Sequence, residues 1–223
     1  MTTRFEPTPR SAARRLARDP VSRRRFLAMT GGVGAAGALL TACGGDDSTT
    51  AAGTAASPDM TAMESQFGAG DLGIVNYALT LEYLEAAFYG DVAKSGLFKG
   101  EQLALIESIG KNEEAHVAAL TATAKKLGTP AKAPKATFPL DDAKSVLDLA
   151  ATVENLGAAA YLGQAGNIED PTILAAALSI HSVEGRHAAL LNILTGKQPT
   201  PDGAFAQPAD MQTVLDEVQP FLA

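Results

Sequence analysis

The stretch LEYLEAAFY at residues 81–89 returns 72 residues later as VENLGAAAY at residues 153–161. A second repeat has an offset of 71 residues and aligns the Glu-x-x-His motif of Glu113–His116 with that of Glu184–His187. Each copy indicates a helix with Glu and Tyr seven residues apart, followed by a helix that carries Glu-x-x-His. The second half of this region therefore duplicates the first, and the two together predict four helices.

Prolines mark where these helices end, because each of the long stretches between them is free of proline. The helices are expected over about residues 71–89, 100–127, 141–162 and 171–194. Asp170 and Pro171 support the fourth start, since Asp caps helix N-termini and proline fits the first helical position. Alternating strand patterns are absent, so we expect an all-α fold.

Two further segments complete the expected architecture, which is a four-helix bundle with a long crossover and a short C-terminal helix. The proline-rich residues 129–140 can span about 40 Å when extended, which is about the length of a helix of 20 to 25 residues. The third helix can therefore run parallel to the second. Apolar residues at helical spacing predict the C-terminal helix, which should cover an end or a side of the bundle. They are Met211, Val214, Leu215, Val218 and Leu222.

Glu82, Glu113, Glu154 and Glu184 each lie on an apolar helix face. At 100° per residue, their neighbours on that face are Ala, Val, Leu, Ile or Tyr, with no Lys or Arg. A buried carboxylate without a partner is so costly that a cation must come from outside the chain. Two divalent metals would neutralise four carboxylates, and four Glu with two neutral His suit iron or manganese. The i,i+3 spacing of Glu-x-x-His puts both side chains within reach of one metal.

The paired motifs resemble the ferritin-like superfamily of di-iron and di-manganese carboxylate proteins, over residues 71–196. More narrowly, the chain resembles the exported ferritin-like domain proteins. The resemblance implies a ferritin-like bundle and two iron or manganese ions per chain. The ligands that it implies are Glu82 and Glu154 as terminal ligands, Glu113 and Glu184 as bridges, and His116 and His187 with one metal each.

Four other polar residues lie near these ligands in the repeat. Tyr89 and Tyr161 either fill the core or donate a hydrogen bond to a ligand carboxylate. Glu85 is a spare carboxylate, but its counterpart in the repeat is Gly157, which favours an accessory or peripheral role. His181 lies one turn before the second Glu-x-x-His and is an extra ligand, a proton shuttle or a satisfied structural histidine.

The first 42 residues differ in charge from the rest of the chain. They carry eight arginines and two acidic residues, whereas residues 43–223 carry ten basic and 23 acidic residues. Arg23 and Arg24, in the sequence SRRRFL, precede a weakly apolar run at residues 28–40 and resemble a twin-arginine export signal. The alternative of a transmembrane helix is disfavoured, because the run is shorter than the roughly 20 apolar residues that span a bilayer.

Leu40-Thr41-Ala42-Cys43 closes this run and resembles a bacterial lipobox, with Cys43 as the lipid-modified first residue of the mature protein. The expected partners are thus the twin-arginine export machinery and a membrane, and the expected location is the outer face of the cytoplasmic membrane. The expected domains are a signal peptide (1–42), a disordered tether (43–70), a ferritin-like bundle (71–196) and a C-terminal extension (197–223).

Composition narrows the classes of function. The acidic body contains one arginine, Arg186, which excludes the cationic footprint of a nucleic-acid-binding protein. Cys43 is the only cysteine, which excludes intrachain disulfides and a cysteine-based zinc site. The leading hypothesis is an exported, lipid-anchored protein with a dinuclear redox centre, acting as a ferroxidase or consuming peroxide. The alternatives are a manganese catalase-like enzyme and a non-enzymatic, stress-related (desiccation-associated) envelope protein. The metal, the substrate and the formation of a homo-oligomer stay open.

Overall fold

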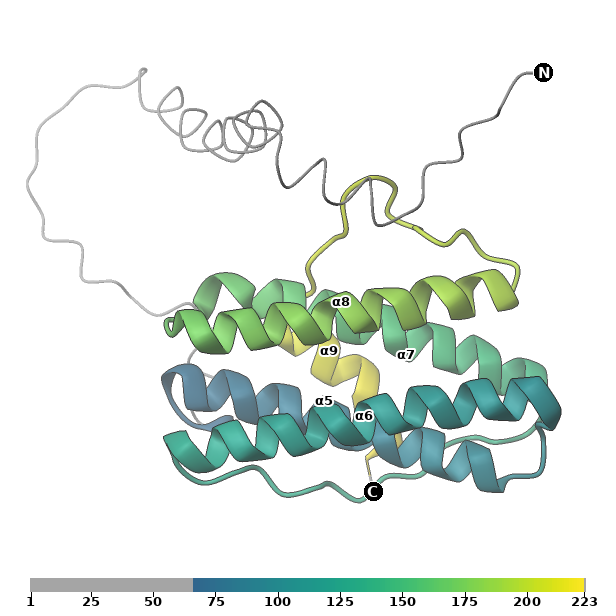
Figure 1. Cartoon of the computed structure of the whole chain (residues 1–223), viewed down its shortest axis with the longest axis horizontal. Coiled ribbons are helices and arrows are strands. Elements are labelled where there is room, and N and C mark those ends of the chain that lie inside the picture. The colour runs from purple at the N-terminus through teal and green to yellow at the C-terminus, as the bar shows by residue number, and fades with distance from the viewer. Residues whose placement is uncertain (1–65, 223) are drawn as a thin grey trace, which may run out of the picture. The chain divides into compact units, whose positions relative to one another are not determined.

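Four long helices make up most of residues 66–222, which are the residues that the computed structural model describes (Figure 1). They are α5 (Gly70–Lys94), α6 (Gly100–Leu127), α7 (Ala143–Gln164) and α8 (Pro171–Leu194). Within this part of the chain there is no strand, only an isolated bridge between Ala136 and Leu222. The predicted all-α fold is therefore confirmed.

Local sequence explains the starts of α7 and α8. Asp142 and Asp170 cap α7 and α8, and each side chain accepts hydrogen bonds from two backbone N–H groups of the first turn. Both α6 and α8 have the predicted bounds. The predicted end of α5 at Tyr89 is wrong, because the helix continues to Lys94. Val92 in the added turn is buried in the core, and this packing outweighs the low helix propensity of the intervening glycine.

The connection between α6 and α7 returns along the outside of the bundle, so α7 runs parallel to α6 as predicted (Figure 1). Buried Asn76 on α5 holds the start of this crossover. Its Nδ2 donates to the carbonyl oxygen of Thr129 at 3.1 Å, and its Oδ1 accepts from the backbone N–H of Ala131 at 2.8 Å. Asn76 Nδ2 also donates to the carbonyl oxygen of Phe67 at 2.9 Å. Phe67, which the sequence places in the tether, is itself only 8% exposed.

The C-terminal extension forms the predicted short helix, α9 (Met211–Val218), followed by a 3-10 turn at Gln219–Phe221. Met211, Val214 and Val218 are buried, and they pack with apolar residues of α5 and α7. Leu215 is half-buried, and Leu222 is 39% exposed at the end of the chain. The extension therefore covers the side of the bundle between α5 and α7.

A close backbone approach holds the extension on α7. The N–H of Ala209 donates to the carbonyl oxygen of Ala159 at 3.0 Å. A Cβ at Gly163 would overlap the carbonyl oxygen of Ala209, so only glycine fits there without a shift. The chain can thus lie flat on α7 just before α9 begins.

Residues 1–65 and 223 lie outside the described part of the chain. The export signal with Arg23 and Arg24, the lipid-modified Cys43 and nearly all of the tether fall there and stay predictions. Between residues 66 and 222, no helix has both the length and the apolar character that crossing a bilayer requires.

Candidate metal centre

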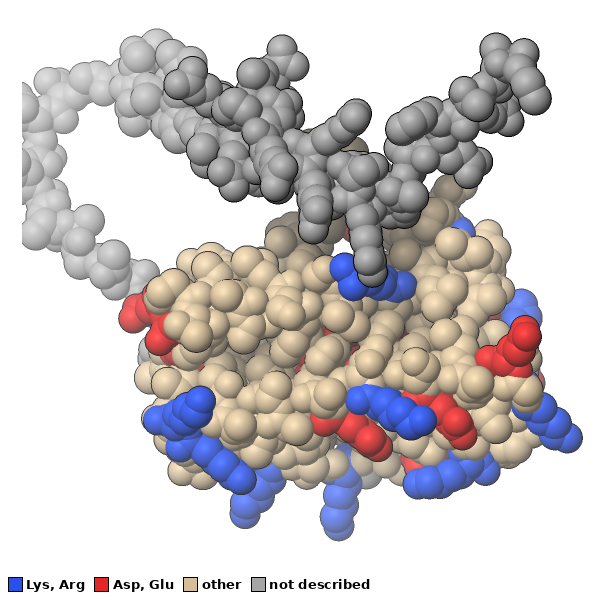
Figure 2. Space-filling model, viewed as in Figure 1, with Lys and Arg blue, Asp and Glu red and all other residues tan. Residues whose placement is uncertain are grey.

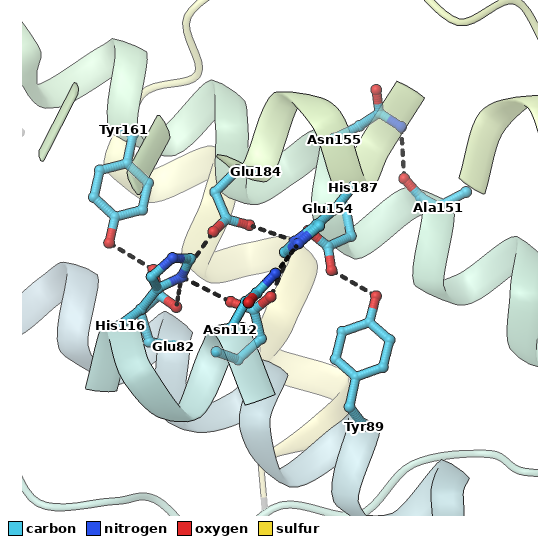
Figure 3. Close-up of polar contacts among 11 residues, drawn as sticks. Glu82, Tyr89, Asn112, His116, Ala151, Glu154, Asn155, Tyr161, Glu184 and His187 are labelled. Carbon is cyan, nitrogen blue, oxygen red and sulfur yellow. Dashed lines mark hydrogen bonds and ion pairs between the residues drawn. The ribbon is translucent and has the colours of Figure 1, made fainter. Parts of the chain in front are cut away.

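The four predicted glutamate ligands come from four different helices and meet inside the bundle. Figure 3 shows three of them, Glu82, Glu154 and Glu184, pointing toward one another. All four side chains are completely buried, at 0% exposure. The two histidines lie one turn after the glutamates of α6 and α8, where the i,i+3 spacing places each imidazole beside the carboxylate of its own helix. The residues are Glu82 on α5, Glu113 and His116 on α6, Glu154 on α7, and Glu184 and His187 on α8.

These side chains form two groups of four, and the ligand atoms within each group lie within 4.8 Å of one another. Glu113 and Glu184 belong to both groups. The first group adds Glu82 and His116, and the second adds Glu154 and His187. The structure thus brings all six predicted ligands together. Two of the carboxylates belong to both groups, and the other two belong to one group each.

Each imidazole faces more carboxylate oxygens than one proton can serve. His116 Nδ1 lies 3.0 Å from both Glu113 Oε2 and Glu184 Oε1, and 3.2 Å from Glu82 Oε2. His187 Nδ1 lies 3.0 Å from Glu113 Oε1 and has a further carboxylate oxygen at 3.2 Å. Because Nδ1 carries at most one proton, it can satisfy only one of these oxygens well.

Three buried carboxylate oxygens of the shared ligands have no hydrogen bond of good geometry. They are Glu113 Oε1 and both oxygens of Glu184. Buried acceptors without a donor are rare and costly in native proteins. A divalent cation binds several oxygens at once, so the donor set fits a pair of such cations better than it fits protons. Hard oxygen ligands with imidazole suit iron and manganese.

Burial and close contact shift the pKa values of the cluster. Burial is the main cause that raises the pKa of Glu82 and of Glu184 to about 8. Burial opposes the charge on His116 and His187, but the surrounding carboxylates prevail and raise the imidazole pKa values to about 12 and about 10. Burial also opposes the charge on Glu113, yet its contacts with both imidazoles hold its pKa below 4.5. Without metal the site therefore holds protons, which bound cations would displace.

Two tyrosines hold the unshared carboxylates, and each reaches across from the other half of the repeat (Figure 3). Tyr89 OH donates to Glu154 Oε1 at 2.5 Å, and Tyr161 OH donates to Glu82 Oε1 at 2.6 Å. Burial, followed by the nearby carboxylates, raises the pKa of both phenols well above 10, so they keep their protons. Both rings are also part of the core. The two roles weighed for these tyrosines thus occur together.

Glu85 lies one turn after Glu82 and is 3% exposed. A Cβ at Gly157 would lie 2.7 Å from Glu85 Oε1 and 3.8 Å from Glu184 Oε2. The carboxyl group of Glu85 therefore fills the space that a side chain at position 157 would take, beside a shared ligand. Burial, followed by repulsion from Glu184 and Glu82, raises the pKa of Glu85 well above 4.5. Without metal, Glu85 therefore favours its neutral form.

His181 lies outside both ligand groups. Its Nδ1 lies 3.0 Å from the carbonyl oxygen of Ala158, so the ring links α8 to α7. It also lines a cavity of about 240 Å³ between α7, α8 and the loop of residues 199–207. Of the roles considered for His181, this position matches the satisfied structural histidine.

Asn112 was not among the predicted residues, although its amide contacts a ligand. Asn112 Nδ2 lies 3.0 Å from His187 Nε2, on the far side of the ring from the carboxylates (Figure 3). The sequence signal is slight, since Asn112 is only marked by its place directly before Glu113. Its counterpart in the repeat is Val183, so the duplication points away from it.

Comparison with known proteins agrees with this geometry. No curated protein matches the chain. A family model described as a ferritin-like domain matches residues 70–197. The matched segment is more than half of the 223 residues and contains α5 to α8 with all six clustered ligands. By its sequence, its fold and the arrangement of its buried carboxylates, the chain belongs to the ferritin-like domain family.

Proposed function

We propose that the protein binds two iron or manganese ions in this centre and uses them in redox chemistry with dioxygen or peroxide. The observation that supports the proposal is the convergence of four buried carboxylates and two imidazoles in two groups that share Glu113 and Glu184. A bound pair of such ions would supply the electrons that the oxidant takes up. Two divalent charges also balance the four carboxylates of Glu82, Glu113, Glu154 and Glu184.

The chain itself orients the ligands and excludes water. Tyr89 and Tyr161 each occupy one oxygen of an unshared carboxylate, which leaves the other oxygen, Oε2, towards the cluster. On the side between α5 and α7, Val214 and Val218 of α9 close over Glu85 and line a small cavity beside it. In the metal-free chain Glu85 favours its neutral form beside Glu184, which makes it a candidate proton donor for a reaction that consumes protons.

A cavity of about 30 Å³ lies against Tyr161 at one end of the site. Its walls come from α5 to α8 and are almost entirely apolar. A volume of this size holds one small molecule, and an apolar lining favours dioxygen over water. The cavity reaches Tyr161, which donates to Glu82, and so offers dioxygen a place beside the centre.

The test of metal binding is elemental analysis of the protein purified from its native envelope, followed by anaerobic loading of the full chain with Fe²⁺ or Mn²⁺. We expect two ions per chain, and oxidation of bound Fe²⁺ when dioxygen or peroxide is added. Oxygen release from peroxide by the manganese form would support a manganese catalase-like enzyme instead. A native protein without iron or manganese, and with no uptake of either, would contradict the proposal and favour a structural envelope protein.

We also propose that the protein is exported and held on a membrane by lipidated Cys43. The support is the order of twin arginines, apolar run and lipobox in residues 22–43. We expect the double variant Arg23→Lys, Arg24→Lys to remain in the cytoplasm, and Cys43→Ala to be exported without lipid. Labelling with radioactive fatty acid measures the second effect. Undiminished labelling of Cys43→Ala would rule out the lipoprotein.

A further inference from the structure

We propose that the two metal positions are unequal, and that Asn112 makes the position at His187 and Glu154 the tighter one. The inference rests on the proposed metal binding and adds an order of filling. A chain with too little metal would then hold one cation at His187, and the position at His116 and Glu82 would fill second.

Asn112 contacts His187 at the ring nitrogen that does not face the carboxylates. His187 Nδ1 lies 3.0 Å from Glu113 Oε1, while its Nε2 lies 3.0 Å from the Asn112 amide (Figure 3). When Nδ1 binds a metal, Nε2 must carry the proton and needs an acceptor. The amide can supply one, because turning it over presents Oδ1 in place of Nδ2. Asn112 can thus partner Nε2 when Nδ1 binds a metal, and it holds the ring in place.

His116 has no such support. Its hydrogen bonds within residues 66–222 all involve Nδ1, and none reaches Nε2. In the repeat, the residue that corresponds to Asn112 is Val183, which is half-buried and has no side-chain donor or acceptor. Within the described residues, no hydrogen bond at Nε2 therefore fixes the ring angle of His116 when its Nδ1 binds a metal.

The two positions share most of their other contacts, but Glu184 is nearer to one of them, with Oε1 at 3.0 Å from His116 Nδ1 and Oε2 at 3.9 Å from His187 Nδ1. Each Nδ1 lies 3.0 Å from an oxygen of Glu113 and has an unshared carboxylate oxygen at 3.2 Å. Each unshared carboxylate also accepts a hydrogen bond from a tyrosine. Partners that orient a metal-bound histidine change metal affinity by about 10- to 100-fold. We expect a difference of that size between the two positions.

Variants of the full chain with one position each measure this difference directly. His116→Ala leaves the position at His187, and His187→Ala leaves the position at His116. Anaerobic equilibrium titration with Mn²⁺ gives one dissociation constant for each variant. We expect His116→Ala to bind Mn²⁺ about 10- to 100-fold more tightly than His187→Ala.

Adding Asn112→Ala to both variants completes a double-mutant cycle. The change should remove most of the advantage of His116→Ala and leave His187→Ala unchanged. Asn112→Asp should restore the affinity of His116→Ala, because a carboxylate accepts the same hydrogen bond. Val183→Asn, added to His187→Ala, should tighten Mn²⁺ binding by giving His116 the missing partner.

A readout that does not depend on affinity is the His187 Nε2–H signal in the NMR spectrum of the Zn²⁺-loaded chain. Asn112→Ala should speed its exchange with solvent and leave the His116 signal unchanged. Equal affinities in the two single-position variants, or an equal loss in both on Asn112→Ala, would overturn the inference while metal binding stands. No Mn²⁺ uptake by the wild-type chain would instead contradict the proposed function.

Discussion

The two halves of the repeat, α5–α6 and α7–α8, share their ligands but differ in what surrounds them. Both halves supply one unshared Glu, one shared Glu, one His and one Tyr to the centre. Around these, Glu85 faces Gly157, and Asn112 corresponds to Val183. The ligands must meet at common points in space, which fixes their positions. Their neighbours only have to fill volume, so they can differ between the halves.

The outer faces of the second and fourth helices differ even more. Charged side chains gather along α6, whereas the visible surface of α8 is nearly free of them (Figure 2). The exposed charged residues of α6 are Glu101, Glu107, Lys111, Glu114, Lys125 and Lys126, and Arg186 is the one on α8. On α8, Leu178, Leu190, Ile193 and Leu194 are 38–58% exposed instead. The two helices thus carry the same Glu-x-x-His motif on their inner faces, although the outer face of α6 is charged and that of α8 is apolar.

Removing a shared ligand should have the largest effect, because both metal positions depend on it. Glu113→Ala or Glu184→Ala takes a ligand from both metal positions, so we expect nearly all metal and all redox activity to be lost. Glu82→Ala or Glu154→Ala takes a ligand from one position and should retain about one ion per chain. Metal analysis after anaerobic loading measures this, with exposed Glu114→Ala as the matched control. Similar losses from shared and unshared ligands would contradict the shared geometry.

The metal-free chain should lose stability as pH rises from about 5 to about 9. Over this range the unfolded chain releases the protons of its Glu and His residues. The folded chain keeps them to higher pH, because the pKa values of Glu82 and Glu184 are about 8 and those of His187 and His116 about 10 and 12. The two glutamates therefore contribute up to about pH 8, and the two histidines contribute above about pH 6.5. Each extra proton in the folded state costs about 1.4 kcal/mol of stability per pH unit.

Urea unfolding of chelator-treated protein at several pH values measures this slope. Glu113 titrates below this range, since its pKa is lowered, and does not offset the effect. With metal bound the slope should reverse, because the ligands bind cations only after they lose their protons. A metal-free chain whose stability rises over the same range would show that the cluster does not hold these protons.

A smaller effect on stability is expected where Glu85 of the first half packs against Gly157 of the second half. Gly157→Ala should destabilise the chain by about 1 to 3 kcal/mol, because the added Cβ would lie 2.7 Å from Glu85 Oε1. Adding Glu85→Ala should recover most of this loss, and Glu85→Ala alone should retain most of the metal. Thermal unfolding of the single and double variants gives the coupling. Strictly additive changes in stability would show that Glu85 and position 157 are not coupled.

The smallest expected effect lies in the helix starts. Asp170 caps α8, whereas Lys99 precedes α6 without a side-chain cap. Asp170→Ala should cost about 1 kcal/mol, and Lys99→Asp should gain a similar or smaller amount. Urea midpoints of the two variants measure both changes. A loss of stability in Lys99→Asp would mean that an Asp cap like that of α8 does not fit the start of α6.

The sequence predicts the helices and the ligand cluster because both depend on short-range patterns. The helical period and the repeat place each Glu on an inner face without knowledge of its neighbours. Asn112 escapes such reasoning, since its role depends on His187, 75 residues away. The burial of Glu85 likewise depends on how closely α5 approaches Gly157. The turn of α5 beyond Tyr89 was missed because tertiary packing of Val92, and not propensity, sustains it.

The two shared glutamates also affect the expected rate of metal release. α5 packs chiefly on α6 and α7 chiefly on α8, so the chain consists of two helical hairpins with sparser contact between them. Glu113 belongs to one hairpin and Glu184 to the other. Ions bound by both would join the hairpins, and the hairpins would have to separate before the ions could leave. Metal release and unfolding would then share one barrier, and both would be slow.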